Sequence, residues 1–174
     1  MILTGSEIGR EIRRGAITFD PFDEASLNPN SINYRLGSRL KVYRRTEEPN
    51  RHVFSEIIIP PDGHVLDAGR MYLGHTLETI GSDAYAMSLI GRSSIGRLGL
   101  FVQASANLGH TTSCHRWTLE LVATRPIRVY PGMRIGQVSF WMNRGAVVPY
   151  RGWYGNQDRP QGSRLLDAAS GARS

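Results

Sequence analysis

Short hydrophobic runs alternate with polar breaks along the chain, which predicts strands over most of its length. The runs are rich in β-branched and aromatic residues, and Gly, Pro, Asn or Asp separates one run from the next. Regular spacing of this kind is typical of a closed β-sandwich or jelly roll, and it does not fit alternating strand–helix units. We expect strands over residues 38–43, 53–59, 64–66, 71–80, 85–90, 100–105, 116–123, 127–130 and 135–141.

The N-terminal segment predicts the main exception, a short amphipathic helix over residues 4–14. Thr4 and Glu7 have the spacing of a capping box, and the apolar positions that follow them share one helical face. Gly15 ends the pattern, because glycine is common just beyond a helix.

Residues 91–100 combine arginines, adjacent serines and glycines between apolar runs. Glycines let the backbone approach a ligand closely, while hydroxyls and arginines bind phosphate oxygens. The segment is not a Walker loop, because no Gly-Lys-Ser/Thr follows its glycines. A solvated basic loop is the alternative. Residues 93–98 also fit one helical turn with Ser93 as its N-cap, which would add a helix N-terminus to an anion site.

Composition narrows the class of protein. The 174 residues fit one domain, and a net charge of +6 favours anionic ligands such as nucleotides. The basic residues are not interleaved with aromatic residues, so we expect no nucleic-acid partner. No apolar run approaches the ~20 residues of a membrane span, and the N-terminus does not resemble a signal peptide. With a lone cysteine, Cys114, this predicts a cytoplasmic protein without a membrane partner.

Glu120 is the candidate proton-transfer group. Strand alternation over residues 117–122 puts Leu119 and Leu121 on one face of a strand, and Glu120 then lies on the other face. An edge-strand glutamate that faces solvent is the plain alternative. If its face looks into a pocket instead, a partly desolvated carboxylate there suits general acid–base catalysis.

Several motifs occur in one order along nearly the whole chain. They are residues 28–37, 91–100, 118–121 and 130–137, together with Ala106 and a tail that carries Tyr150, Tyr154, Gln157, Ser163 and Arg164. In this order they resemble the dCTP deaminase branch of the trimeric dUTPase superfamily. The resemblance implies an all-β fold with a short N-terminal helix, a distorted jelly-roll β-barrel over residues 1–149. It also implies a homotrimer with active sites between subunits, and a lid over residues 150–174 that orders over the ligand.

The resemblance further implies hydrolytic deamination of the cytosine base of dCTP, which gives dUTP and ammonia. Glu120 would take a proton from the attacking water and help to protonate the departing ammonia. Ser93 would hold the water, and the carbonyl of Ala106 would be the second partner of that water. Arg97 would orient Glu120 and Ser93.

The nucleotide-binding residues are also implied by the resemblance. Arg92 and Ser94, from a neighbouring subunit, would bind phosphates. Gln137 would contact the nucleotide, and Tyr154 and Gln157 would close over the triphosphate. Magnesium would accompany the phosphates as a counter-ion and would not be the catalyst.

A catalytic zinc is not expected. Zinc nucleobase deaminases carry H-x-E and P-C-x-x-C motifs, and the chain has neither. His110, Cys114 and His115 stand close together, but their spacing fits no standard zinc site, so an ordinary loop accounts for them.

Residues 107–116 depart from the family pattern. The aromatic residue and the later glycines of the family's turn are missing here, which leaves sugar and base specificity open. The triphosphatase relatives use an aspartate in this loop to activate water. Because no Asp or Glu stands between Asp83 and Glu120, we do not expect pyrophosphate hydrolysis by that mechanism. His110 and His115 are candidates to contact a phosphate or an altered base.

Two alternative functions stay open on these departures. Trp153 stands where the family often has lysine, which suits a deaminase for another cytosine nucleotide in a specialised pathway. A non-catalytic nucleotide-binding regulator of the same fold is the other alternative. The joint presence of Ser93, Arg97 and Glu120 argues against the regulator, because binding alone does not need a water-activating set.

Overall fold

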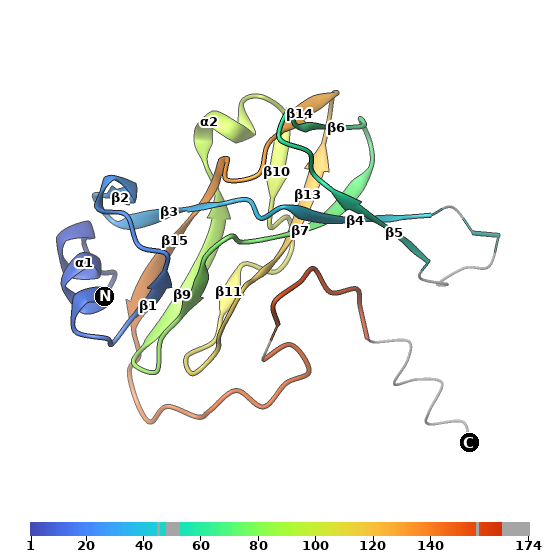
Figure 1. Cartoon of the computed structure of the whole chain (residues 1–174). Helices are drawn as coiled ribbons and strands as arrows, with labels where there is room; N and C mark the ends of the chain where they lie inside the picture. The colour runs from blue at the N-terminus through green and yellow to red at the C-terminus, as the bar shows by residue number, and fades with distance from the viewer. Residues whose placement is uncertain (45, 48–52, 156, 165–174) are drawn as a thin grey trace, which may run out of the picture.

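The computed structural model describes residues 1–44, 46–47, 53–155 and 157–164. Within this part, two five-stranded antiparallel sheets enclose the hydrophobic core (Figure 1). The first sheet has the order β10 (Leu100–Val102), β13 (Thr118–Ala123), β7 (Met71–His75), β4 (Arg39–Tyr43) and β5 (Phe54–Ile58). The second has the order β11 (Leu108–Gly109), β9 (Tyr85–Gly91), β15 (Arg134–Met142), β3 (Ser31–Arg35) and β2 (Leu27–Asn28).

Small elements complete the fold. Together with the two large sheets, they confirm the predicted all-β jelly-roll class with a short N-terminal helix. Helix α1 (Gly5–Arg13) lies against β2 and β3, and helix α2 (Ser93–Gly96) follows β9. No helix in the described part of the chain is long and apolar enough to cross a membrane. The remaining elements are β1 (Thr18–Asp20), a 3-10 turn (Glu24–Ser26), β6 (His64–Leu66), β8 (Thr79–Gly81), β12 (Cys114–His115) and β14 (Ile127–Val129).

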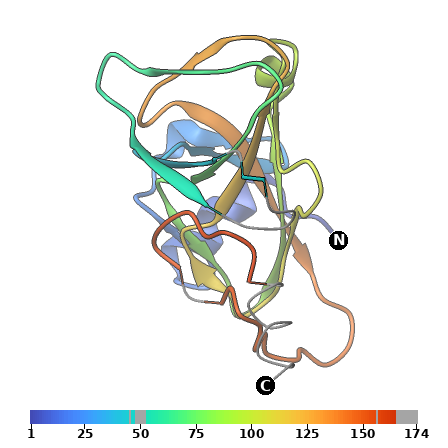
Figure 2. The ribbon, with the colours of Figure 1, turned by 90° about the vertical axis from the view of Figure 1, so that its right-hand side faces the viewer.

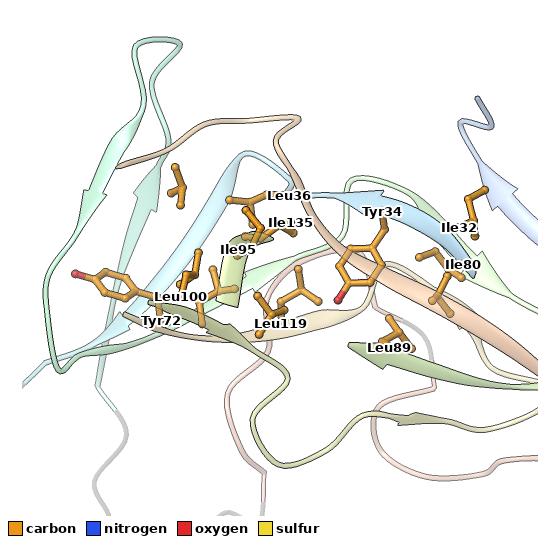
Figure 3. Close-up of a cluster of buried hydrophobic side chains, with 14 of the residues drawn as sticks. Ile32, Tyr34, Leu36, Tyr72, Ile80, Leu89, Ile95, Leu100, Leu119 and Ile135 are labelled. Carbon is orange, nitrogen blue, oxygen red and sulfur yellow. The ribbon is translucent and has the colours of Figure 1, made fainter. Parts of the chain in front are cut away.

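The core is built from the inner faces of the two large sheets, as Figure 3 shows. Leu119 and Leu121 of β13 are fully buried, as the alternation in the sequence predicts. Ile32 and Tyr34 of β3 are fully buried as well, and the Tyr34 hydroxyl donates to the carbonyl of Ile90 at 3.0 Å. Burying each such side chain contributes roughly 1.5–3 kcal/mol, so β13 and β3 are held firmly in place.

Helix α1 begins as its sequence predicts, one residue inside the expected bounds at each end. Thr4 is the N-cap, and its hydroxyl accepts a hydrogen bond from the N–H of Glu7 at 3.4 Å. The carboxylate of Glu7 then pairs with Arg10 on the next turn. Beyond the helix, Gly15 has φ +81°, a left-handed conformation that glycine adopts at little cost.

Two of the predicted strands are interrupted well before their expected ends. The run 71–80 divides into β7 and β8, because the Thr76 hydroxyl donates to the carbonyl of Glu78 at 2.7 Å and accepts from the N–H of Trp117 at 2.9 Å. The run 100–105 ends at Val102 because Gln103 takes φ +55°, which leaves the extended region.

Strand β3 was not predicted, although it lies inside the second sheet. Its residues 31–34 are all buried, so no alternation of apolar and polar positions marks it. The amide of Asn33 donates to the carbonyl of Ser26 and to Oδ1 of Asn28, both at 3.2 Å, which compensates for burying it. The other missed strands, β1, β2, β11 and β12, have only two or three residues each.

The helical turn predicted over residues 93–98 is present but shorter, and the prediction of Ser93 as its N-cap is wrong. Arg92 continues the extended conformation of β9 with φ −103° and ψ 145°, so it takes the N-cap position and Ser93 is the first helical residue. A single turn has too small a dipole to form an anion site by itself. The arginines and serines must therefore supply any such site.

Gly136→Ala tests the packing of β15 on β3. An added methyl group would stand 2.0 Å from Cζ of the fully buried Tyr34. We expect the free energy of unfolding to fall by about 1–3 kcal/mol, the usual cost of overpacking a core. Gly96→Ala in α2 is the control, because no atom lies within 4 Å of its methyl position. Urea denaturation compares the two variants, and equal stability would contradict the described packing.

Candidate active site

A cavity of about 450 Å³ lies between the face of β13, the loop that precedes this strand, and the tail of the chain. Figure 2 shows the tail, in red, in front of the body of the fold. Apolar and aromatic side chains form much of the lining, among them Leu73, Trp117 and Tyr154, and Glu120 joins them from β13. No arginine or lysine of the described residues lines this cavity, so it is suited to the uncharged part of a ligand.

Glu120 faces this cavity from an interior strand, which excludes the edge-strand alternative. β13 is paired with β10 on one side and with β7 on the other, and Glu120 is half-buried. Ser105 holds its carboxylate: the Ser105 hydroxyl lies 3.0 Å from both Oε1 and Oε2, and the Ser105 N–H donates to Oε2 at 3.1 Å. The carboxylate is therefore oriented by one short loop.

Gln103 fastens that loop to β13. Its N–H donates to the carbonyl of Glu120 at 3.0 Å, and its Oε1 accepts from the N–H of Glu120 at 2.9 Å. Its Nε2 donates to the carbonyl of Ala106 at 3.0 Å. Sequence reasoning missed Gln103 and Ser105, because it extended the strand through both and so concealed the turn that brings them over Glu120.

Tyr43 lines the same cavity from β4. Burial raises the pKa of its hydroxyl, and the charges of Glu120 and Tyr154 raise this pKa further. Tyr43 is therefore a protonated phenol at neutral pH, placed near the Glu120 carboxylate.

The two histidines of the divergent loop have different surroundings. His115 is buried, its Nδ1 lies 3.0 Å from the carbonyl of Arg116, and its ring is tilted against Trp117 at 4.2 Å. Burial lowers the pKa of His115, which keeps it neutral at pH 7 and unsuited to act as a cation for phosphate. His110 is exposed and stacks on Tyr150, with the ring centroids 5.0 Å apart.

The tail is attached to the start of β13 by hydrogen bonds. The carbonyl of Gln157 accepts from the N–H of Arg116 at 3.0 Å, and the N–H of Gln161 donates to the hydroxyl of Thr118 at 3.1 Å. Tyr154 accepts at its hydroxyl from the N–H of Arg164. The described tail therefore lies at the cavity as far as residue 164. A lid over residues 150–174 stays a prediction, and residues 156 and 165–174 lie outside the described part.

Thr112 connects the divergent loop to the tail through a strained backbone. Its φ of +74° lies in the left-handed region, which is costly for a β-branched residue. Its N–H donates to the carbonyl of Ser82 at 2.8 Å, and its hydroxyl accepts from the N–H of Tyr150 at 2.9 Å. These two bonds hold the turn in place and fix the point where the tail begins to cover the cavity.

The predicted site residues fall into two groups in one chain. Ala106, Glu120, Tyr154 and Gln157 line the cavity. The remaining residues lie on or beside α2 and do not line it; they are Arg92, Ser93, Ser94, Arg97 and Gln137.

Three of the predicted site residues on and beside α2 face outward, whereas Ile95 of this helix is buried in the core. Ser93, Ser94 and Arg97 are exposed, and Arg92 donates to the carbonyl of Arg134 at 3.5 Å. Gln137 is bonded inside the fold, where its Oε1 accepts from Ser31 at 2.7 Å and its Nε2 donates to the carbonyl of Gly91 at 3.4 Å. No contact within the described chain joins Arg97 to Glu120.

Comparison with known proteins identifies the family. Residues 2–143 match the family model described as dCTP deaminase-like, which is well over half of the chain. The chain belongs to the dCTP deaminase-like family. A relative from Cytophaga hutchinsonii, named "dCTP deaminase, dUMP-forming", is 44% identical over 155 residues, which cover 87% of this chain and 88% of the relative. A relative of the same name from Clostridium acetobutylicum is 39% identical over 170 residues, which cover 95% and 96%.

A solved structure gives the fold of this dCTP deaminase-like chain independent support. The 2′-deoxycytidine 5′-triphosphate deaminase of Agrobacterium tumefaciens superimposes with a TM-score of 0.66 at 24% identity. The match covers 82% of this chain and 48% of that protein. The chain therefore spans about half the length of that solved structure.

In the described part of the chain, no group of three or more His, Cys, Asp and Glu side chains could hold a metal ion. Cys114 is exposed, whereas His115 is turned inward against Trp117. A reaction without zinc stays a prediction from the sequence.

Thr112→Gly separates the backbone strain at Thr112 from the hydrogen bond by which the Thr112 hydroxyl holds the tail at Tyr150. Glycine relieves the left-handed strain and removes the bond to Tyr150. We expect hydrogen exchange at the Tyr150 amide to accelerate about five- to tenfold, the effect of losing roughly 1 kcal/mol. The melting temperature should not fall, because strain relief offsets the lost bond. Thr112→Ser keeps the hydroxyl and is the control; equal exchange rates in both variants would show that this bond does not hold the tail.

Proposed function

We propose that the chain catalyses the hydrolytic deamination of the cytosine base of dCTP, with Glu120 as general base and then general acid. The supporting observation is the Glu120 carboxylate, held by Ser105 at the wall of a cavity with largely apolar and aromatic surroundings. The names of both relatives support dCTP as the substrate. A cavity of about 450 Å³ has room for a base and a sugar.

The proposed reaction moves both protons of the attacking water through Glu120. The carboxylate takes the first proton as the water oxygen bonds to C4 of cytosine, and N3 receives this proton as the C4–N3 double bond opens. The carboxylate then moves the proton of the new C4 hydroxyl to the amino nitrogen. The C4–N bond breaks, ammonia leaves, and C4 keeps its oxygen as the carbonyl of uracil. Ser105 orients the carboxylate for these transfers. The carbonyl of Ala106 accepts one bond from Gln103 and has a second lone pair for the attacking water.

The triphosphate requires charges that this cavity does not provide. Its described lining contains no arginine or lysine. Ser93, Ser94 and Arg97, on and beside α2, are exposed and do not line it. We therefore propose a homotrimer in which α2 of one subunit completes the cavity of its neighbour. Arg97 and Ser93 would then reach Glu120 and the water, and Arg92 and Ser94 would bind phosphates.

The remaining expectations fit this arrangement. Gln137 would support the nucleotide end of α2 through its bond to Gly91, and Tyr154 and Gln157 would cover the ligand from the tail. Magnesium would enter with the phosphates as their counter-ion, and the base chemistry would proceed without zinc. A nucleotide substrate also fits the cytoplasmic location that the lone cysteine predicts.

Mixed trimers test both the chemistry and the shared site. Glu120→Gln and Arg97→Ala should each lower deamination of dCTP by about 10²-fold or more. If each site takes Glu120 from one subunit and Arg97 from its neighbour, trimers reassembled from equal amounts of the two variants should regain about a quarter of wild-type activity. Release of ammonia measures the rate.

The outcomes separate the two parts of the proposal. A mixture that stays inactive would place both residues in one chain's site. An active Glu120→Gln protein would remove Glu120 from the chemistry. Glu24→Gln, which changes an exposed glutamate on the 3-10 turn, is the matched control. A panel with dCMP and CTP distinguishes another cytosine nucleotide, and turnover of no member would favour the regulator.

We further propose that the reaction continues to dUMP. The sequence favours dUTP as the product because the loop lacks an aspartate. An aspartate is only one means of activating water, so its absence does not rule out this second reaction. In this second step, water would bond to the α-phosphorus of the dUTP formed and give up a proton to solvent. The bond from the α-phosphorus to the bridging oxygen would break, and pyrophosphate would leave. The two relatives are named as dUMP-forming. We expect chromatography of the products of dCTP to yield dUMP and pyrophosphate, both lost in Glu120→Gln; accumulation of dUTP would instead support the expectation from the sequence.

A further inference from the structure

His115 and Gln157 are two buried polar side chains at the cavity, and Nε2 of Gln157 has no hydrogen-bond partner among the described residues. The two residues are only 6% and 8% exposed, and both line the cavity wall. They are adjacent in space, because the N–H of Arg116, the residue after His115, donates to the carbonyl of Gln157 at 3.0 Å. The chemistry proposed at C4 of the base uses neither side chain.

We propose that His115 and Gln157 together bind the 3′-hydroxyl of the substrate's sugar and thereby select nucleotides that carry it. This inference rests on the proposed function, since it takes a deoxycytidine nucleotide as the ligand of the cavity. The two residues would contact the substrate without taking part in the proton transfers of Glu120.

His115 supplies a hydrogen-bond acceptor. Its Nδ1 lies 3.0 Å from the carbonyl of Arg116, and a carbonyl only accepts, so Nδ1 carries the proton. Burial lowers the pKa of the ring, so the ring is neutral and Nε2 is left unprotonated. Contact with Trp117 fixes the plane of the imidazole. The hydrogen bond of the ring is made at Nδ1, so Nε2 is the nitrogen that can accept from a ligand.

Gln157 supplies a donor. The hydroxyl of Thr118 accepts from the N–H of Gln161, so its own proton is directed to Oε1 of Gln157 at 3.3 Å. This assigns the other end of the amide as Nε2, which is buried and has no partner in the described chain. An unpaired buried donor costs about 1–3 kcal/mol, so a ligand atom that accepts from it would be bound favourably. Because Nε2 is enclosed, that atom must arrive before the tail closes.

A hydroxyl group is the ligand atom that satisfies both residues. It donates to Nε2 of His115 and accepts from Nε2 of Gln157, whereas the carbonyl and ring nitrogen of the base only accept. The position of Thr118 and Glu120 along β13 agrees with a hydroxyl of the sugar as the ligand group. Thr118, which holds Gln157, lies on the same face as Glu120 and about 7 Å away, farther than the width of a pyrimidine ring. With C4 at Glu120, the pair lies beside the sugar, and the 3′-hydroxyl is the free hydroxyl of a 2′-deoxynucleoside triphosphate.

Steady-state kinetics with dCTP and 2′,3′-dideoxy-CTP test the inference. We expect wild type to lose about tenfold or more in kcat/KM when the 3′-hydroxyl is absent. His115→Phe keeps the ring shape and removes the acceptor, so it should lower kcat/KM for dCTP by a similar factor and leave that for the dideoxy substrate unchanged. His64→Phe, a substitution on β6 away from the cavity, should retain the wild-type preference.

Two outcomes would count against the inference. An equal loss for both substrates in His115→Phe would mean that His115 supports the fold or the base. A change confined to the ratio of dCTP to dUTP affinity would mean that His115 reads the base edge. The same ratios are measured as dissociation constants of the Glu120→Gln protein by calorimetry. A protein that binds but never deaminates, yet still prefers the 3′-hydroxyl through His115, would refute the proposed function and leave this inference standing.

Discussion

Glu120 lies on a strand whose opposite face is the centre of the core, and this constraint shapes the rest of the molecule. Side chains of a strand alternate, so the full burial of Leu119 and Leu121 fixes the side on which Glu120 emerges. A slip of one residue in register would put a carboxylate into the core, at a cost that no contact there could offset. The packing that stabilises the fold therefore also fixes the position of Glu120. Ser105 completes this placement by bonding both carboxylate oxygens.

Charge is divided across the surface of one subunit. The cavity collects aromatic and polar uncharged groups around Glu120, while α2 exposes arginine and serines elsewhere. A nucleoside triphosphate has the same division, with an uncharged base and sugar at one end and phosphates at the other. In the proposed homotrimer, the cavity of one copy would take the base and sugar, and α2 of its neighbour would bind the phosphates. Assembly would then be a condition for chemistry and not only for stability.

The divergent loop over residues 107–116 depends on one strained residue. Thr112 occupies a left-handed conformation that glycine would adopt without strain, and two hydrogen bonds hold it there. Its hydroxyl in turn anchors the tail at Tyr150. His115, which follows in the same loop, is neutral because it is buried, so it acts as an acceptor and not as a cation. The loop therefore places a neutral histidine in the wall of the cavity that Glu120 also lines.

The sequence by itself determined the features that depend on neighbours a few residues away. The start of α1 at Thr4, most strands and the face of Glu120 follow from capping chemistry and from the period of two. Tertiary structure decided the features that depend on distant partners. The turn that brings Ser105 over Glu120, the fully buried β3, the neutral state of His115 and the separation of α2 from the cavity are of this kind. Periodicity records which side of an element is buried; only the packed fold sets which distant groups share a cavity, because that depends on how the sheets and the tail close together.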